Sequence, residues 1–430
     1  MTTTELPGLT FHTLTAADHD GDRSSLLRGW NEALLRGFHE GRLSDDHERH
    51  WLEATRADSI RMTGAWPSSV AVGDPAMPVA TYASWGGELN VGGGRRLPLH
   101  MISDVTVSPT HRRRGLLRRL MVDDLRSAQQ QGLALAALTA SEGAIYGRFG
   151  FGPATRLRVV EVDVTSRFAL RQPLVGDGSL ELVEPEAAWD TMRAVVERHC
   201  SATRGAVPWP AFYEPIMTGR YDFDAGGPNR KSRVVVHLDA HGTPDGFAVY
   251  EHAGQVDGRG TVDAKALVGL TDAAHLALWR FLADVDLTER VRYRRHREVD
   301  PLDWALVDHR VVRTTSAYDL LWLRVLDVVA ALEARPWYGD GTVVLEVEDS
   351  LGLTDGRWRV SVTQGRAEVA STEDPAQVRL SSETLGALYL GGIDVATLTS
   401  AGRVSGEDDA LARWSAMADG GPPPYCATGF

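Results

Sequence analysis

Residues 105–117 read Val-Thr-Val-Ser-Pro-Thr-His-Arg-Arg-Arg-Gly-Leu-Leu, and they lead from an apolar strand through a basic turn into a helix. We expect the strand over residues 102–107 and the turn at Ser108-Pro109. Gly115 lets the backbone approach a ligand without a Cβ in the way. Free backbone N–H groups and the positive end of the helix dipole then meet guanidinium charge at one point. Such a point is suited to a diphosphate, although arginines before a helix are also common as a solvated surface cluster.

The helix after this turn is predicted to be amphipathic and to stop at Gly132. The turn is not a P-loop, because no Gly-Lys-Ser or Gly-Lys-Thr closes it, and it is not a Gly-x-Gly-x-x-Gly loop. The apolar residues expected on one face of the helix are Leu116, Leu117, Leu120, Met121 and Leu125, and the charged residues expected mostly on the other are Arg118, Arg119, Asp123 and Asp124.

A second motif follows this helix. Residues 133–139 are a short apolar run suited to a buried parallel strand. Ser141 is a candidate N-cap for a short helix, Glu142 would lie in its first turn, and Tyr146 about one turn later. The predicted order is therefore strand, phosphate turn, helix, strand and a short helix that carries a tyrosine.

This order resembles the Gcn5-related N-acetyltransferases (GNAT), whose Arg-x-x-Gly pyrophosphate loop, matched here by Arg112 and Gly115, holds acetyl-coenzyme A. The two motifs together resemble one branch almost letter for letter: the enhanced intracellular survival (Eis) family of actinobacterial aminoglycoside N-acetyltransferases. The resemblance covers nearly the whole chain, and the matching stretches are residues 111–117, 140–143, 145–150, 300–302, 313–315, 321–324, 331–335 and 388–391.

The resemblance implies an α+β chain of three domains. Residues 1–156 would be a GNAT domain with the acetyl-coenzyme A site, residues 157–307 a second GNAT-like domain without a coenzyme site, and residues 308–430 a sterol carrier protein-like α/β domain whose C-terminus enters the active site. The order of strands and helix in the first domain recurs in the second, but no Arg-x-x-Gly precedes the last helix there, which Thr271 is expected to cap. In the third, residues 343–347 and 358–363 alternate like half-buried antiparallel strands.

Acetyl transfer to an amine needs a base for the amine, donors for the oxyanion and an acid for the departing thiolate. Tyr146 suits the acid, because a phenol with a pKa near ~10 stays protonated at neutral pH, while the thiol has a pKa near ~8.5. The resemblance makes Tyr146 the catalytic tyrosine; the alternative is a buried tyrosine that only packs the coenzyme helix. Backbone N–H groups of residues 105–107 can serve the oxyanion and hold the pantetheine arm like an added strand. The residues expected to bind acetyl-coenzyme A are Val105, Thr106, Val107, Arg113, Arg114, Gly115, Leu116, Leu117, Arg118, Ser141 and Glu142.

Residues 420–430 combine a stiff proline segment with an apolar, uncharged tail. Chain ends usually fray, yet a tail that carries Tyr425, Cys426 and Phe430 is expected to dock against the protein. The resemblance implies that the carboxylate of Phe430 enters the active site as the general base. An α-carboxylate with a pKa near ~3.5 is a weak base for an ammonium, so it would need burial, a relayed water or acidic neighbours.

The net charge of −13 disfavours a nucleic-acid partner and favours cationic ligands. No apolar run is long enough to span a membrane, and residues 1–5 lack the start of a secretory signal, so we expect a cytoplasmic protein without a membrane partner. Cys200 and Cys426 are expected to be small buried hydrophobes.

Three other features are given structural interpretations. The basic run at residues 292–297 is interpreted as a solvated strand edge, and residues 92–94 as a hairpin turn. Residues 45–50 lack His-Glu-x-x-His and are interpreted as a solvated helix face, so no metal site is expected.

These observations predict an acetyl-coenzyme A-dependent N-acetyltransferase that acts on amines of aminoglycosides or other polyamine-like molecules, at more than one position. Acetyl-coenzyme A would be a co-substrate, and no prosthetic group is expected. The resemblance further implies a homohexamer, and it places Phe38, Glu40 and Trp51 in a region that lines the amine site. The alternative from a different class is a coenzyme-binding scaffold or sensor without significant turnover.

Overall fold

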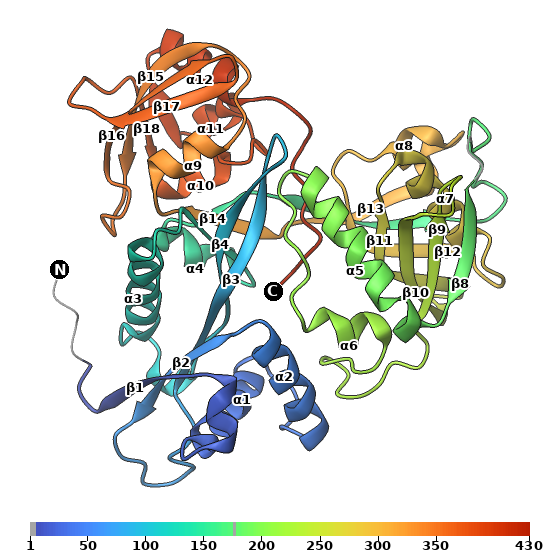
Figure 1. The fold of residues 1–430 in the computed structure, drawn as a ribbon, viewed down its shortest axis with the longest axis horizontal. Helices are drawn as coiled ribbons and strands as arrows, with labels where there is room; N and C mark the ends of the chain where they lie inside the picture. Colours follow the sequence, from blue (N-terminus) through green and yellow to red (C-terminus); the bar gives the residue numbers. More distant parts are fainter. Residues whose placement is uncertain (1–5, 175–177) are drawn as a thin grey trace.

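The computed structural model describes residues 6–174 and 178–430, and their strands form three sheets (Figure 1). Two sheets have seven strands each, and a third sheet of five strands comes from the C-terminal part of the chain. The expectation about a secretory signal over residues 1–5 lies outside the described residues. Mixed sheets with helices packed on them confirm the α+β class.

The first sheet forms around the basic turn described above. Its helices cover opposite faces, because α3 packs with Tyr82 in one core cluster while α1 and α2 pack with Ala83 in another, and neighbouring residues of a strand point to opposite faces. Its strands, in spatial order, are β1 (Leu9–Leu14), β2 (Arg61–Pro67), β3 (Ala80–Gly92), β4 (Arg95–Val107), β5 (Leu135–Thr139), β14 (Leu321–Val325) and β6 (Gly152–Pro153), and its helices are α1 (Ser24–Gly37), α2 (Asp45–Ala57), α3 (Leu116–Gln130) and α4 (Gly143–Tyr146).

The second sheet repeats the arrangement with its own helices. The cap predicted for α7 is confirmed, since the Thr271 side chain accepts a hydrogen bond from the backbone of Ala274. Its strands, in spatial order, are β13 (Val312–Asp319), β7 (Arg156–Asp163), β12 (Arg290–His296), β11 (Arg259–Gly269), β10 (Pro244–Val256), β9 (Arg233–Leu238) and β8 (Ser179–Val183), and its helices are α5 (Pro185–Ala202), α6 (Tyr213–Thr218), α7 (Asp272–Ala283) and α8 (Pro301–Ala305).

The two seven-stranded sheets exchange one strand each. Along the chain β7 follows β6, yet it pairs with β12 and β13, while β14 follows β13 and pairs with β5 and β6. The two crossing segments bond to each other, because the Ala154 N–H donates to Leu321 O and the Leu320 N–H to Thr155 O, at 2.8 and 3.1 Å. Both β13 and β14 lie after residue 308, so the start expected for the third domain contains strands that complete the first two sheets.

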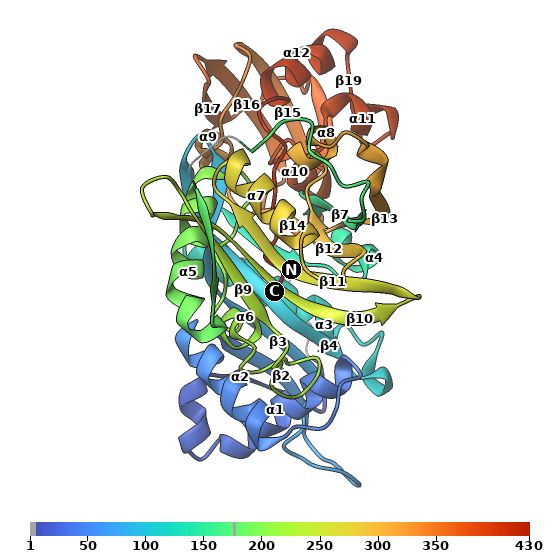
Figure 2. The same ribbon diagram turned by 90° about the vertical axis from the view of Figure 1, so that its right-hand side faces the viewer.

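The third sheet packs with four helices at the end of the first sheet (Figures 1 and 2). Residues 343–347 and 358–363 pair antiparallel, as predicted. The strands, in spatial order, are β17 (Arg366–Ser371), β16 (Gly356–Thr363), β15 (Gly341–Glu348), β18 (Val378–Ser381) and β19 (Val404–Gly406), and the helices are α9 (Val328–Ala334), α10 (Ser382–Leu388), α11 (Val395–Ser400) and α12 (Asp408–Ala418).

Each of the first two sheets contains one parallel strand pair, and the two pairs are alike. In the first, β4 and β5 pair over four positions, from Leu99 opposite Leu135 to Ile102 opposite Leu138. In the second, β11 and β12 pair over four positions and end with Ala264 opposite Tyr293. The described residues show no further pairing within either pair, so each sheet opens between these strands after the fourth position. The opening is where each domain can receive a ligand or another segment.

Two simple structural predictions are also settled by the fold. Residues 92–94 form the hairpin between β3 and β4, as predicted, with left-handed φ angles at all three glycines. Among the helices of residues 6–174 and 178–430, none is long and apolar enough to cross a membrane.

Candidate active site

The turn before α3 is exposed and built around two left-handed residues. Arg113 has φ +62° and Gly115 φ +83°, and Gly115 occupies the N-cap position of α3 without a side-chain cap. A Cβ built on Gly115 would meet no atom within 4 Å. The first-turn N–H groups of this long helix therefore face open space beside Arg112, Arg113 and Arg114, which fits the predicted diphosphate site.

The opening between β4 and β5 lies next to this turn. From Ala80 to Thr81, β3 pairs with Thr106 and Val107 on one edge of β4, and the other edge of these residues faces the opening. Backbone N–H groups there are the donors that an oxyanion and an extended pantetheine arm require. The predicted strand residues 105–107 therefore border the opening and lead directly into the turn before α3.

Tyr146 ends the short helix α4 on the far side of the opening. Its side chain is only 7% exposed and packs in one core cluster with Leu116, the first residue of α3, and with Trp322. Burial, and then the charge of Glu142, raise the pKa of the phenol. Tyr146 therefore stays protonated at neutral pH, as an acid must, and it also packs the coenzyme helix, so both roles weighed for it are compatible with its position.

The predicted N-cap of α4 is wrong. The helix begins at Gly143, which makes Glu142 the N-cap residue, and no side chain caps it. Both Ser141 and Glu142 are exposed in the loop that leads from Thr139 to the helix. Because these side chains are not used by the helix, they stay accessible at the mouth of the opening, where their predicted contact with the coenzyme is still a prediction.

The C-terminal tail docks against the protein, as its apolar composition predicts, and its last residue reaches the first domain. The Phe430 oxygen accepts a hydrogen bond from the hydroxyl of Thr139, and its backbone N–H donates to the same hydroxyl at 3.3 Å. The Phe430 ring lies edge-on to Trp85, with centroids 5.8 Å apart. Thr139 is the last residue of β5, directly beyond the last paired position. The end of the chain therefore lies at the opening, near the centre of the molecule (Figures 1 and 2).

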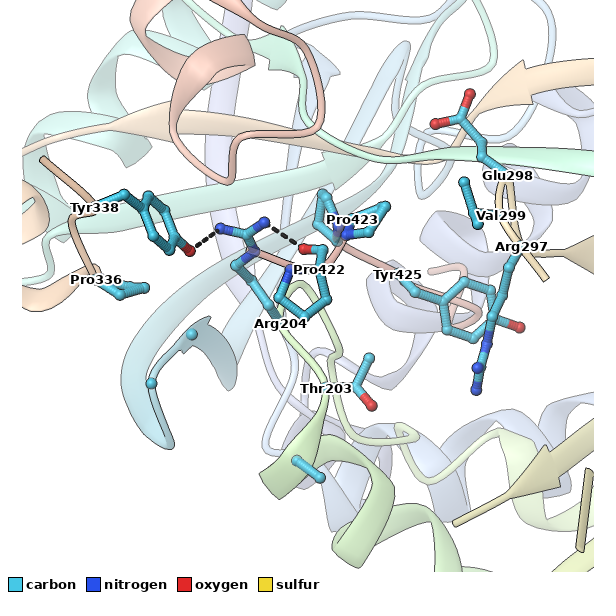
Figure 3. A pocket seen from close by; sticks show the side chains of 14 residues that line it. Thr203, Arg204, Arg297, Glu298, Val299, Pro336, Tyr338, Pro422, Pro423 and Tyr425 are labelled. Carbon is cyan, nitrogen blue, oxygen red and sulfur yellow. Dashed lines mark hydrogen bonds between the residues drawn. The ribbon is translucent and has the colours of Figure 1, made fainter. Parts of the chain in front are cut away.

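A pocket of about 310 Å³ lies upstream along the same tail, where the three domains meet. Figure 3 shows Arg204 between the hydroxyl of Tyr338 and the carbonyl oxygen of Pro422, to both of which it donates hydrogen bonds. None of the residues that line it in the described part of the chain belongs to the predicted coenzyme or catalytic set. The pocket thus marks the path of the tail and not the coenzyme site.

Three carboxylates gather on the acceptor side, and the sequence pointed to only one of them. Asp104 lies in a bulge of β4 with φ +55°, and its backbone oxygen accepts a hydrogen bond from Thr81 at 2.7 Å. Burial raises the pKa of Asp104 to about 6. A hydrogen bond from Ser103 opposes this shift, and the charge of Glu40 adds to it. Burial, and then the charge of Asp224 from the second domain, raise the pKa of Glu40. A cationic ligand would relieve this like-charge repulsion.

One charged position of the coenzyme helix was wrongly interpreted. Asp124, expected mostly on the solvated face of α3, instead accepts hydrogen bonds from the hydroxyls of Tyr82 and Ser84 at 2.8 and 3.0 Å. The His100 Nε2 lies 2.5 Å from the same carboxylate. This network fastens α3 to β3 and β4, so it fixes the helix whose N-terminus forms the phosphate turn. The sequence carries no local signal for it, because Asp124 lies 24 to 42 residues from its three partners.

The interpretation of residues 292–297 as a solvated strand edge is also wrong. Residues 292–296 belong to β12, which lies between β7 and β11, and His296 is fully buried. The guanidinium of Arg295 donates to the hydroxyl of Tyr213 and to the carbonyl oxygen of Ala427 at 3.0 and 2.6 Å. This basic run is therefore mostly an internal strand, and its Arg295 binds the C-terminal tail.

Residues 45–50 are only in part the solvated face expected of them. His47, Glu48 and His50 are buried, and His47 lies edge-on to Tyr221 of the second domain at 5.9 Å. Asp45 and Asp46 are exposed. Across residues 6–174 and 178–430, no three His, Cys, Asp or Glu side chains are grouped as a metal would need.

Models of known families match three parts of the chain. An acetyltransferase (GNAT) domain matches residues 24–154, another acetyltransferase (GNAT) domain matches residues 217–325, and a sterol carrier protein domain matches residues 328–427. The N-acetyltransferase Eis of Mycobacterium tuberculosis is 37% identical over 358 residues, which are 81% of this chain and 83% of that protein. The chain belongs to the Eis family of N-acetyltransferases.

Other members and solved structures agree with this assignment. An uncharacterized N-acetyltransferase of Streptomyces avermitilis is 38% identical over 344 residues, 78% of this chain and 81% of that protein. The crystal structure of Eis1 from Mycobacterium abscessus has a TM-score of 0.80 at 28% identity and covers 98% of this chain and 100% of its own. These matches confirm two tandem GNAT domains followed by a sterol carrier protein-like domain.

As an Eis-family member, the protein is an acyltransferase that takes an acyl-coenzyme A and an amine. This is the first of the two functions weighed from the sequence. Within the Eis fold, the exposed turn before α3 follows β4, and the chain end at Thr139 and the helix α4 that ends at Tyr146 adjoin the end of β5. The sequence found each of these from local motifs or from the resemblance, and it missed Asp104, Arg295 and the Asp124 network.

Proposed function

We propose that the protein transfers acetyl groups from acetyl-coenzyme A to amines of polycationic acceptors, aminoglycosides or similar polyamines, at more than one position. The observation that carries the proposal is the seat of Phe430 on Thr139, at the mouth of the opening that the coenzyme turn and α4 also border. The carboxylates of Glu40 and Asp104, whose pKa values are raised by burial and by like charge, support a cationic acceptor.

The reaction needs three contributions from the chain. Acetyl-coenzyme A, when bound, supplies a thioester whose carbonyl carbon accepts the amine. The exposed turn from Arg112 to Gly115 would hold the diphosphate, and backbone N–H groups of β4 would donate to the carbonyl oxygen as it becomes an oxyanion. The thioester would then lie between Phe430 and Tyr146.

Two proton movements complete the step. The carboxylate of Phe430 accepts a proton from the acceptor ammonium, so that the free amine can form the C–N bond. As the C–S bond breaks, the phenol of Tyr146 donates its proton to the sulfur. For unperturbed groups that transfer is uphill by roughly 2 kcal/mol, a small part of the barrier that ordinary turnover implies.

The test is a thiol-release assay with a graded amine panel. The protein is mixed with acetyl-coenzyme A and a monoamine, a diamine, a linear polyamine or an aminoglycoside, and both free thiol and product mass are followed. We expect turnover to rise with the charge of the acceptor and the products to carry more than one acetyl group. Equal rates for the monoamine and the aminoglycoside would contradict the acceptor class, and no thiol release would contradict the reaction.

We also propose that the protein assembles as a homohexamer. Exposed apolar side chains on one short stretch of the second domain support an interface: Val299, Trp304 and Val307 are 65, 78 and 56% exposed. Light scattering at micromolar concentration should give a mass several times that of one chain. A particle near the 46.9 kDa of the monomer would contradict this.

A further inference from the structure

The tail that ends at Phe430 occupies the openings of both GNAT domains. In the first domain Phe430 binds Thr139, one residue beyond the last paired position of β5. In the second domain the hydroxyl of Tyr425 donates to the backbone oxygen of Arg295 at 2.7 Å, two residues beyond the last paired position of β12. It also lies 3.4 Å from the hydroxyl of Tyr293, which holds that last position.

We infer that the second GNAT domain anchors the C-terminus for catalysis, and that Tyr425 and Arg295 are the residues that position the carboxylate of Phe430. The inference rests on the proposed function, since it takes that carboxylate as the base. It assigns a use to an opening that lacks a coenzyme turn.

The hydrogen bonds of the tail divide sharply between the domains. From Tyr425 to Gly429, those described to other parts of the chain all go to the second domain, and only Phe430 bonds to the first. The bonds to the second domain are Tyr425 N–H to Arg204 O, Tyr425 hydroxyl to Arg295 O and with the Tyr293 hydroxyl, Arg295 to Ala427 O, Thr428 hydroxyl to Val207 O, Gly429 N–H to the Tyr213 hydroxyl and the Tyr213 hydroxyl to Gly429 O.

Arg295 connects two of these bonds and reaches the residue next to the base. Its guanidinium donates to Ala427 O and to the hydroxyl of Tyr213, and that hydroxyl accepts from the Gly429 N–H at 2.8 Å. Tyr425 is buried, with the guanidinium of Arg297 5.0 Å from its ring centroid and the ring of His199 edge-on at 5.9 Å. The anchor is therefore a packed, charged socket and not a surface contact.

The spacing of the anchors fixes the reach of the chain end. Arg204 donates to the carbonyl oxygens of Gly420 and Pro422, and the proline segment that follows is stiff (Figure 3). A slip of one residue would move the carboxylate by up to ~3.6 Å, and a misplacement of about 1 Å in an active site can cost about 10²-fold in rate. Holding Tyr425 in its socket prevents that slip.

The experiment compares full-length variants in kcat, KM, acetyl-coenzyme A affinity and melting temperature. Tyr425→Phe keeps the ring and removes the bond to Arg295 O, and we expect kcat to fall about 10-fold with a melting temperature lowered only by the loss of one buried hydrogen bond. Arg295→Gln should lower kcat about 10²-fold, and Arg295→Lys should restore part of it. Acetyl-coenzyme A affinity should stay within a few-fold for all three, because the phosphate turn lies in the other domain.

The matched control is Arg290→Gln. Arg290 lies on the same strand, is buried and pairs with Glu161, but no hydrogen bond or ion pair described for it involves the tail. We expect it to lower the melting temperature about as much as Arg295→Gln while kcat stays within about 2-fold. An equal loss of kcat in this control would mean that Arg295 acts only through stability, and the inference would be overturned.

A variant extended after Phe430 separates failure of the anchor from failure of the proposed base. An inactive extended protein, together with full kcat in Tyr425→Phe and Arg295→Gln, would overturn the anchor and leave Phe430 as the base. An extended protein with full activity would overturn the base itself, and with it the positioning role. Loss of kcat in the extended protein and in both variants, with the control intact, supports both.

Discussion

The two GNAT domains share a strand order and a four-position parallel pair, but the helix that connects the two strands of that pair begins differently in each. In the first domain α3 begins at Gly115, with left-handed φ, no side-chain cap and exposed arginines before it. In the second, Thr271 caps α7, Asp272 occupies its first turn and the N–H of Leu270 donates to Asp245 O. A helix N-terminus that already has a side-chain cap and a carboxylate in its first turn is poorly suited to a diphosphate.

The openings between the strands differ as well. Two residues past the last paired position, the first domain has Asp104, whereas the second has the buried Ala266. The first opening is therefore lined with charge and receives only the last residue of the tail, while the second is filled by Tyr425. One scaffold can therefore serve as a catalytic site or as an internal clamp, depending on a few residues beyond the last paired position of the same strand pair.

The largest effect should come from moving the carboxylate out of the first opening. Adding residues after Phe430 replaces the carboxylate by an amide, and deleting Phe430 shortens the reach by up to ~3.6 Å. Acetylation should drop to background in the thiol assay, while calorimetry should give acetyl-coenzyme A affinity within a few-fold. A tag at Met1 is the matched control and should leave turnover unchanged. Full activity of the extended protein would rule out Phe430 as the base.

The next effect concerns Tyr146, the proposed acid of the first domain. Tyr146→Phe removes one hydroxyl and little packing, so turnover should fall about 10²- to 10⁴-fold. Thermal unfolding should be unchanged, since the ring keeps its contacts with Leu116 and Trp322. Normal turnover with a normal melting curve would make Tyr146 a packing residue only, the alternative weighed from the sequence.

A smaller effect should come from the phosphate turn. Gly115→Val places a β-branched side chain at φ +83°, where the backbone would have to approach a diphosphate, and should weaken acetyl-coenzyme A binding about 10-fold or more. Gly242→Val is the matched control in the second domain, because Gly242 has φ +76° and an equally open Cβ position. Calorimetry should show one site per chain, lost affinity only in the first variant and similar destabilisation in both. Two sites, or equal affinity in both variants, would contradict a single coenzyme domain.

Local motifs made much of the first domain and the cap of α7 predictable. The features that the sequence did not predict depend on contacts between residues far apart in the chain. The turn, α3, the tyrosine helix and the Thr271 cap each depend on residues close together in the chain. The exchange of β7 and β14, by contrast, depends on Thr155 meeting Leu321, 166 residues away. The charges of residues 292–297 indicated a surface for the same reason, since the partner of Arg295 is a tail 132 residues further on. Periodicity carries no information about such partners.

The smallest expected effect sharpens the contrast between Asp104 and Ala266. The folded state raises the pKa of Asp104 from 3.8 to about 6, so the folded protein binds more protons than the unfolded chain between these values. Stability due to this group is therefore highest below pH 4, falls as pH rises towards 6 and stays low above it. Asp104→Asn, which tolerates φ +55°, should raise the free energy of unfolding by about 1–2 kcal/mol at pH 8 and by almost nothing at pH 4. The acceptor KM should rise a few-fold at pH 8, because a cation loses a carboxylate partner. Urea denaturation at both pH values checks the first effect, and an equal change at pH 4 and pH 8 would show that the carboxyl of Asp104 is not the group that titrates.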